Sequence, residues 1–346
     1  MDLRRISAAK HARKIVDVCV NVKPSESILV VTDTTNFEVG EVFANAVAAT
    51  GAEAVLTVMT PRKYHYQPPP RAVCEAAKNC DALIGAASTF FEAHNVQAFE
   101  TLKAGTRVYG FSGGTLDLLA SESFEADFVR IHPIVEKLVQ LESESKKIQI
   151  TAPNGTNLTF GVGRKGVVTS GVLTGPGQFT SGPNIEANMS PMEGTSIGTI
   201  VADAALTPYW SPLDGIIKAT VESGRIVNID GGKSAQEWRQ FLTNARDENV
   251  YNIAQFAIGM NPFCKISGIG PGIDDEGVYG TCHFGTGTSI ILGGRVVAPF
   301  HFDLVLWKPT IMLDGKVIEK DGLLVPEQIG IEASRLTELG FAVAKH

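Results

Sequence analysis

Cysteine is scarce in this sequence, and no two cysteines form a C-x-x-C pair. Only five of the 346 residues are cysteine. They stand at Cys19, Cys74, Cys80, Cys264 and Cys282. An odd number of thiols, with no visible signal peptide, is typical of a reducing compartment. We therefore expect free thiols and a cytoplasmic protein.

Charge of one sign and long apolar runs are also missing. The 30 basic and 37 acidic residues give a net charge of −7, which is spread along the chain without long runs. This balance argues against nucleic acid or an anionic membrane surface as a partner. Because no apolar run is long enough to cross a bilayer, we expect no membrane association.

The first part of the chain alternates apolar strands with amphipathic helices. We predict strands over 27–32, 53–59, 81–87 and 107–111. Helices are predicted over 4–21, 38–50 and 95–104, with a helix-rich stretch over 122–146. Such alternation indicates a parallel sheet covered by helices on both faces.

After Lys147 the composition shifts toward short strands separated by turn residues. The predicted strands lie at 148–151, 157–160, 166–170, 199–204, 216–221 and 226–229. Hairpins are predicted at 222–225 and 313–316, and Ser234 is predicted to cap a helix. The fold class is therefore α/β. We predict a Rossmann-like parallel-sheet domain over residues 1–147 and a β-rich α+β catalytic domain over 148–346 that carries a metal site.

The stretch from 296 to 306 places two polar residues in a predicted apolar strand. Side chains alternate across a strand, so His301 and Asp303 point to one face while Phe302 and Leu304 point to the other. An imidazole and a carboxylate side by side are half of a metal site. The alternative is a hydrogen-bonded His–Asp pair in the core.

Further potential metal ligands lie upstream of this strand. Glu276 ends an acidic cluster at 274–276, His283 follows seven residues later, and Glu193 stands alone before an apolar stretch. Together with the strand pair they provide four or five donors that could converge. The alternatives are an acidic helix N-terminus for the cluster and a solvated loop position for Glu193.

Four short motifs occur together in the second half. They are Asn-x-x-Pro-x-Glu-Gly at 188–194, Gly-x-Asn-Pro at 259–262, Asp-Glu-x3-Gly-Thr-x-His at 275–283 and His-x-Asp at 301–303. The combination resembles the aminopeptidase T family of metallopeptidases, and the resemblance extends through the first half. It implies that the metal ligands are Glu193, Glu276, His283, His301 and Asp303. A sixth family ligand, a glutamate, falls on Gln255, and an amide bridges two cations poorly.

A second set of motifs includes the stretch 279–287, the glycine pair 293–294, Pro-x-His-x-Asp at 299–303 and His94 eleven residues before a Gly-Thr-Arg. This set resembles a compact branch of the same superfamily that includes enzymes similar to 2,5-dihydroxypyridine 5,6-dioxygenase. The resemblance implies that His94 acts on the substrate; the alternative is a surface residue at a helix N-terminus. The branch uses two histidines and one carboxylate as iron ligands. Its remaining histidine also falls on Gln255.

Metal-assisted chemistry is thus expected, and three functions remain open. The main prediction is a hydrolase in which zinc, cobalt or manganese activates water to cleave an amide bond of a small molecule or short peptide. His94 or Tyr279 would place or protonate that substrate, and Gln255 would orient a ligand or the water. The alternative is an Fe(II) dioxygenase that opens a hydroxylated pyridine or similar ring. The third is an inactive small-molecule binding protein. The family resemblance also implies a homodimer.

Overall fold

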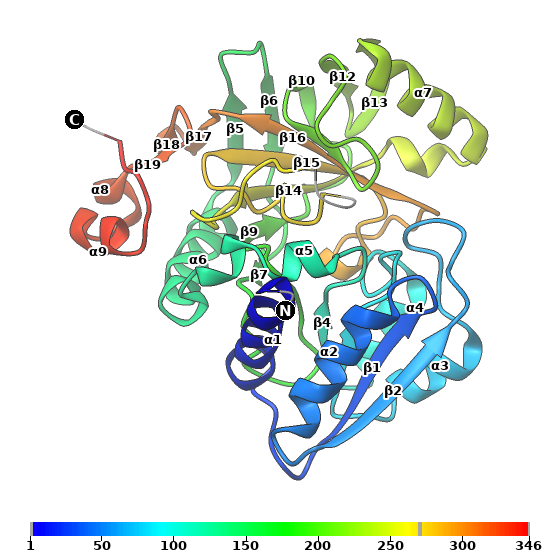
Figure 1. Ribbon diagram of the computed structural model, residues 1–346. Helices are drawn as coiled ribbons and strands as arrows, with labels where there is room; N and C mark the ends of the chain where they lie inside the picture. Colours follow the sequence, from blue (N-terminus) through cyan, green and yellow to red (C-terminus); the bar gives the residue numbers. More distant parts are fainter. Residues whose placement is uncertain (1–2, 269–271, 345–346) are drawn as a thin grey trace.

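Three β-sheets organise residues 3–268 and 272–344, the part of the chain described by this computed structural model (Figure 1). The first sheet is parallel, with the strand order β2-β1-β3-β4-β8. Its strands are β1 (Ser27–Asp33), β2 (Glu53–Met59), β3 (Ala82–Gly85), β4 (Arg107–Gly110) and β8 (Phe179–Ser181).

Apolar residues bury both faces of this sheet, as its run of aliphatic residues predicts. Val30 of β1 belongs to the same core cluster as Phe43 of α2 (Phe37–Ala48). The next residue, Val31, packs on the opposite face in a cluster with Val73 of α3 (Arg71–Ala77). Helices therefore cover the sheet from both sides, and the predicted parallel α/β region is confirmed.

The other two sheets are antiparallel. The eight-stranded sheet has the order β13-β12-β10-β6-β5-β17-β18-β19 and the six-stranded sheet the order β11-β16-β15-β14-β9-β7. The eight strands are β5 (Lys147–Thr151), β6 (Asn157–Gly161), β10 (Ile197–Ala202), β12 (Ile217–Glu222), β13 (Arg225–Gly231), β17 (Thr310–Leu313), β18 (Lys316–Lys320) and β19 (Leu323–Leu324). The six strands are β7 (Val167–Thr169), β9 (Glu186–Met189), β11 (Ala205–Thr207), β14 (Ile253–Gly259), β15 (Thr281–Gly287) and β16 (His301–Trp307).

Helices lie mainly around the first sheet and at the edges of the antiparallel sheets (Figure 1). They are α1 (Leu3–Lys14), α2 (Phe37–Ala48), α3 (Arg71–Ala77), α4 (Val96–Lys103), α5 (Leu116–Leu119), α6 (Phe128–Glu144), α7 (Lys233–Ala245), α8 (Pro326–Ile329) and α9 (Ala333–Glu338). A π-helical turn, Ile15–Cys19, continues α1. Helix α3 has no counterpart among the predicted elements.

Two local predictions are wrong. Gly232, not Ser234, is the N-cap residue of α7, and the Ser234 hydroxyl instead accepts a hydrogen bond from the Asp214 backbone amide. The strand predicted from residue 296 begins only at His301. Pro299 lacks the backbone N–H that a sheet interior requires, so the chain pairs regularly only after it.

Both strand pairing and core packing connect the two sides of the predicted domain boundary at residue 147. Strand β8 comes from beyond this point, yet it pairs with β4 and completes the first sheet. One core cluster includes Val30 of the first sheet and Phe284 of the six-stranded sheet. The boundaries 1–147 and 148–346 stay a prediction.

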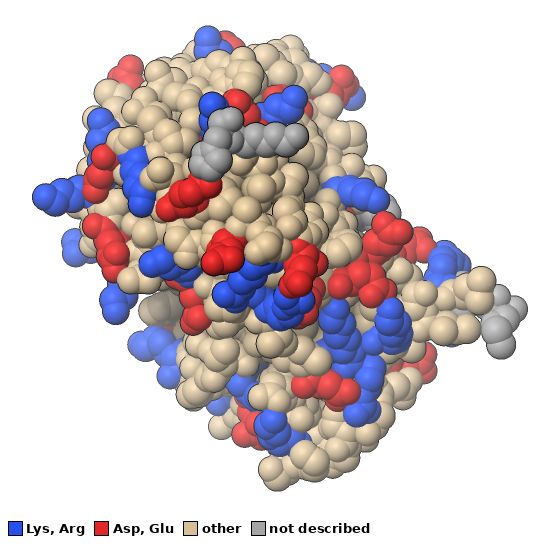
Figure 2. All heavy atoms as spheres, turned by 90° about the vertical axis from the view of Figure 1, so that its left-hand side faces the viewer, with Lys and Arg blue, Asp and Glu red and all other residues tan. Residues whose placement is uncertain are grey.

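Over the face shown in Figure 2, basic and acidic side chains are interspersed. All five cysteines are free, as expected. None of the helices within the described ranges combines the length and the apolarity that a membrane span requires. The predictions about partners and dimerisation stay predictions.

Candidate active site

Three neighbouring strands of the six-stranded sheet, β14, β15 and β16, form the floor of the candidate site. Their register aligns Gln255 with Gly285 and Gly285 with Asp303. Side chains alternate along each strand, so these positions share one face. On the other face Phe256 and Phe284 are aligned and lie in the core. The apolar core face thus fixes which polar side chains point away from it.

Gly285 leaves a gap at the centre of this floor. A Cβ atom at this position would lie 2.6 Å from the Gln255 Cβ and 2.6 Å from the His301 Nε2. Any side chain here would meet the polar groups directly, so glycine keeps a cradle open between them.

The imidazole rings of His283 and His301 lie on this face, and both turn Nε2 toward the space that Gly285 leaves open. Nδ1 of His301 lies 3.0 Å from the Thr288 carbonyl oxygen, and Nδ1 of His283 lies 3.3 Å from the Glu276 carbonyl oxygen. A carbonyl only accepts hydrogen bonds, so each Nδ1 carries the proton in the neutral ring. Each Nε2 then presents a lone pair, which is how metal-binding histidines are held.

The lone pairs converge with a carboxylate. Nε2 of His301 lies 3.1 Å from Asp303 Oδ1 and 3.1 Å from Gln255 Oε1, and Nε2 of His283 lies 3.7 Å from Asp303 Oδ1. Acceptors facing one another need a cation or proton between them. Two imidazole nitrogens, a carboxylate and the open cradle therefore fit a divalent metal ion.

The Gln255 amide currently lies between the two rings. Its Nε2 donates to His283 Nε2 at 3.0 Å and to Asn188 Oδ1 at 2.7 Å. Asn188 in turn donates to Thr169 Oγ1 at 2.9 Å, which fixes the orientation of both amides. As these side chains stand, no three His, Cys, Asp or Glu residues in the described part of the chain form a group that could hold a metal ion.

Buried carboxyl groups surround the convergence point. Burial raises the pKa of Glu276 well above its ordinary value, and Asp303 raises it further. Burial also raises the pKa of Glu186, against an opposing effect of His283. Burial disfavours ionisation of Asp303 too, but His301, His283 and His94 together outweigh it, and the pKa of Asp303 is lowered to about 2. None of the described residues that line the cavity is Lys or Arg. A bound cation would therefore stabilise the ionised forms of these carboxyl groups.

The first half of the chain supplies His94, the residue upstream of Gly105 that the family resemblance singled out, and it lines the cavity. Its ring stacks on His301 with 3.6 Å between centroids, and Tyr66 meets it edge-on at 5.3 Å. His94 and Tyr66 both have positive φ angles, 57° and 67°, which are strained for residues other than glycine. Burial lowers the pKa of His94 well below its ordinary value, so the ring is neutral.

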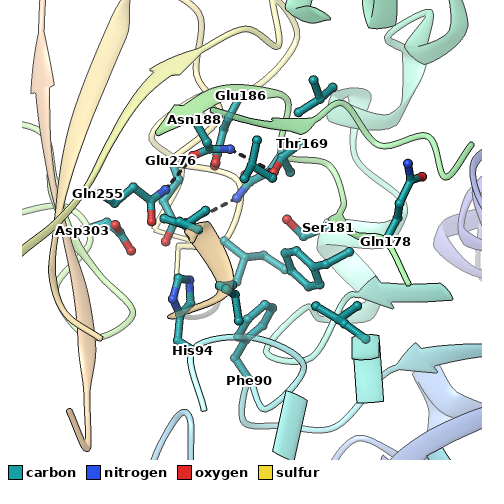
Figure 3. A pocket seen from close by; sticks show the side chains of 18 of the residues that line it. Phe90, His94, Thr169, Gln178, Ser181, Glu186, Asn188, Gln255, Glu276 and Asp303 are labelled. Atoms are coloured by element: carbon teal, nitrogen blue, oxygen red, sulfur yellow. Dashed lines mark hydrogen bonds between the residues drawn. The ribbon is translucent and has the colours of Figure 1, made fainter. Parts of the chain in front are cut away.

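A cavity of about 340 Å³ opens in front of this floor (Figure 3). Figure 3 shows Glu186, Asn188, Gln255, Glu276 and Asp303 gathered at one end, with His94 and Phe90 approaching from the other side. Phe179, Ile291 and Leu292 add apolar walls. The volume and the mixed lining suit a small aromatic molecule.

Two of the predicted site residues lie elsewhere. Arg164 holds Glu193 in an ion pair and lowers its pKa to about 2, and Glu193 does not line the cavity. The Tyr279 hydroxyl donates to the Ala342 carbonyl and accepts from the Leu324 amide, so it fastens the C-terminal segment. The ligand set proposed below therefore omits Glu193, and the catalytic set omits Tyr279.

Glu186 is the carboxyl group in the cavity that sequence reasoning missed; it also missed Tyr66, Phe90 and Asn184. Strand β9 places Glu186 two residues before Asn188, on the same face. An isolated Glu-x-Asn with no apolar alternation gives no strand signal. The sequence signal that could have identified Glu186 is its position two residues before the 188–194 motif.

The family model and the curated relative name the same enzyme. The model of the 2,5-dihydroxypyridine 5,6-dioxygenase family matches residues 8–326. A 2,5-dihydroxypyridine 5,6-dioxygenase from Pseudomonas putida is 25% identical over 252 residues, which are 68% of this chain and 69% of that protein. The solved structure of 2,5-dihydroxypyridine dioxygenase from Pseudomonas putida aligns with a TM-score of 0.80 at 20% identity, over 94% of this chain and 99% of that one. AmpT from Thermus thermophilus aligns with a TM-score of 0.60 at 14% identity, over 92% of this chain and 99% of that one.

These findings overturn the main prediction of an aminopeptidase-like hydrolase. The family match spans most of the chain and names a dioxygenase, whereas the likeness to AmpT is one of fold alone. The resemblance to the dioxygenase-like branch is confirmed, and the fold is shared with AmpT. The chain therefore belongs to the 2,5-dihydroxypyridine 5,6-dioxygenase family.

Proposed function

We propose that this protein is a ferrous-iron-dependent dioxygenase that opens a hydroxylated pyridine or a similar heteroaromatic ring. The observation that carries the proposal is the convergence of His283 Nε2, His301 Nε2 and Asp303 Oδ1 beside the Gly285 cradle. Two histidines and one carboxylate are the ligand set of non-haem ferrous oxygenases, and they leave positions open for substrate and O₂.

In this proposal His283 replaces the histidine that the family resemblance places at Gln255. The Gln255 side chain moves out of the space between the two imidazole rings and keeps its hydrogen bond to Asn188. It then orients the metal ligands without binding the metal itself. When bound, ferrous iron supplies the electron transfer that lets O₂ react with the ring.

His94 is proposed as the base. Its Nδ1 is buried and has no hydrogen-bond partner among the described residues. A neutral imidazole stacked on His301 is ready to accept the proton of a ring hydroxyl at that nitrogen. Tyr66 and Phe90, whose rings meet at 5.8 Å, provide an apolar wall that orients an aromatic substrate and excludes water.

The overall reaction is inferred from the named activity of the relatives. Both atoms of O₂ enter the product, and the ring bond between carbons 5 and 6 breaks. The cavity admits a ring of this size, and its acidic lining disfavours an anionic competitor.

The test uses protein purified without oxygen and loaded with Fe(II) or, for comparison, with Zn(II). With 2,5-dihydroxypyridine and air, the iron form should remove the ring absorbance and the zinc form should not. His301→Ala should lose both iron and activity. His11→Ala, which removes another buried imidazole on α1, should keep both. An iron form that leaves the ring intact would contradict the proposal.

A further inference from the structure

Two hydrogen-bond acceptors at the inner end of the cavity have no donor. Oε1 of Glu186 and Oδ1 of Asn184 are buried, and neither has a hydrogen-bond partner among the described residues. The side chains are 5% and 3% exposed, and both residues line the cavity. Leaving a buried acceptor unpaired is costly, so two of them in one cavity indicate a ligand that brings a donor.

The protein groups nearby do not supply that donor. The Asn184 amide already donates to Glu276 Oε2 at 3.1 Å, and Thr207 donates to the other oxygen of Glu276. The Asn188 amide donates to Thr169 Oγ1 and also forms a hydrogen bond with the Glu186 carboxyl group, but Glu186 Oε1 still has no partner among the described residues. This end of the cavity therefore offers mainly acceptors.

The position of Glu186 on the sheet bears on which part of the substrate ring it would contact. Strand β9 lies beside β14, with Glu186 opposite Gly259 and Asn188 opposite Ala257. Glu186 thus stands on the face of the floor, next to Asn188 and Gln255 (Figure 3). In a 2,5-dihydroxypyridine ring the nitrogen is bonded to carbon 6, so a group that binds the ring N–H must stand close to the reacting carbons.

Resting on the proposed function, we infer that Glu186 and Asn184 form an acceptor subsite for the ring N–H of the substrate in its lactam form. The subsite makes the protein select nitrogen heteroaromatic rings over carbocyclic rings with the same hydroxyl pattern. A site built to bind an N–H rejects the analogue that lacks it, because its own acceptors then stay unpaired.

The experiment measures binding without turnover. Iron-loaded protein is titrated under nitrogen with 2,5-dihydroxypyridine and with hydroquinone, in which C–H replaces the ring nitrogen. Wild type should bind the pyridine about tenfold to a hundredfold more tightly, as expected when a buried acceptor would otherwise stay unpaired. Glu186→Met should reduce this preference to within about threefold, while hydroquinone affinity and iron content stay unchanged. Glu222→Met, at an exposed position at the end of β12, is the matched control.

Thermal melting separates a binding role from a structural one. A buried carboxyl group that is retained for binding destabilises the folded state, so Glu186→Met should melt no lower than wild type. A lower melting temperature, loss of iron, or an unchanged preference for the pyridine would overturn the inference. So would a wild type without preference between the two rings. If wild type shows the preference but consumes no O₂, the proposed function fails while the subsite stands.

Discussion

Substituting Gly285 by alanine perturbs the candidate active site at its centre with a single methyl group. The new Cβ would lie 2.6 Å from His301 Nε2, 2.7 Å from His301 Cε1 and 2.6 Å from Gln255 Cβ. Carbon atoms in contact prefer about 3.5–4.0 Å. The imidazole must therefore retreat by roughly 1 Å, and misplacing a reacting group by that distance costs on the order of a hundredfold in rate.

The effect on stability should be smaller than the effect on function. Overpacking a buried position costs about 1–3 kcal/mol, and the atoms that must move belong to side chains. Gly285→Ala should therefore fold, melt somewhat lower, and bind iron weakly. Gly161→Ala in β6 is the matched control, because its Cβ would meet nothing closer than 3.4 Å.

The assay combines elemental analysis after anaerobic desalting, thermal melting and turnover of 2,5-dihydroxypyridine. Gly161→Ala should keep iron and stay within about twofold of wild-type turnover, as expected for a position away from the site. A Gly285→Ala variant with a full iron complement and wild-type turnover would refute the assignment of the cradle to the metal.

Three further predictions follow from individual side chains. His94→Ala should keep the iron but lose about a hundredfold or more of turnover, as removal of a positioned base does; loss of iron would make it a ligand instead. Gln255→Glu should raise the metal content from one ion toward two per chain, measured beside wild type, because a second carboxylate can bridge cations; two ions in wild type would contradict this. Glu142, fully buried on α6, has its pKa raised by burial to about 8, and its carboxyl oxygens have no partner among the described residues. The native state thus holds a proton that the unfolded state releases, so stability should fall as the pH rises from about 4.5 to 8. Glu142→Gln should remove on the order of 4 kcal/mol of this dependence, seen as a smaller drop in melting temperature between pH 5 and pH 8; an unchanged drop would count against it.

Where the apolar pattern is continuous, the sequence predicts the fold well. The strands β1 and β2 and the helix α2 fall within one or two residues of their predicted bounds. Their side chains bury both faces of a parallel sheet, so an unbroken aliphatic run is the expected signal.

Strands β14 and β15 escaped prediction because they form the site. Gln255 and His283 interrupt the apolar pattern, and Gly285 lacks a side chain altogether. These positions face the cavity, so the same side chains that carry the proposed chemistry remove the strand signal.

The choice between Glu193 and Glu186 was beyond sequence reasoning for a different reason. Both lie near Asn188, and a motif cannot reveal that Arg164, far away in the chain, pairs with Glu193. Long-range pairing of that kind emerges only when the sheets are assembled. His301, Asp303 and His94, in contrast, were predicted from local motifs, and the structure brings them together in space.

The most direct test of the central claim is the fate of oxygen. Iron-loaded protein is supplied with 2,5-dihydroxypyridine under ¹⁸O₂, and the product is weighed by mass spectrometry. A dioxygenase consumes one O₂ for each ring opened and leaves both labelled atoms in the product. A product with a single labelled atom, or one formed without O₂ uptake, would contradict the account.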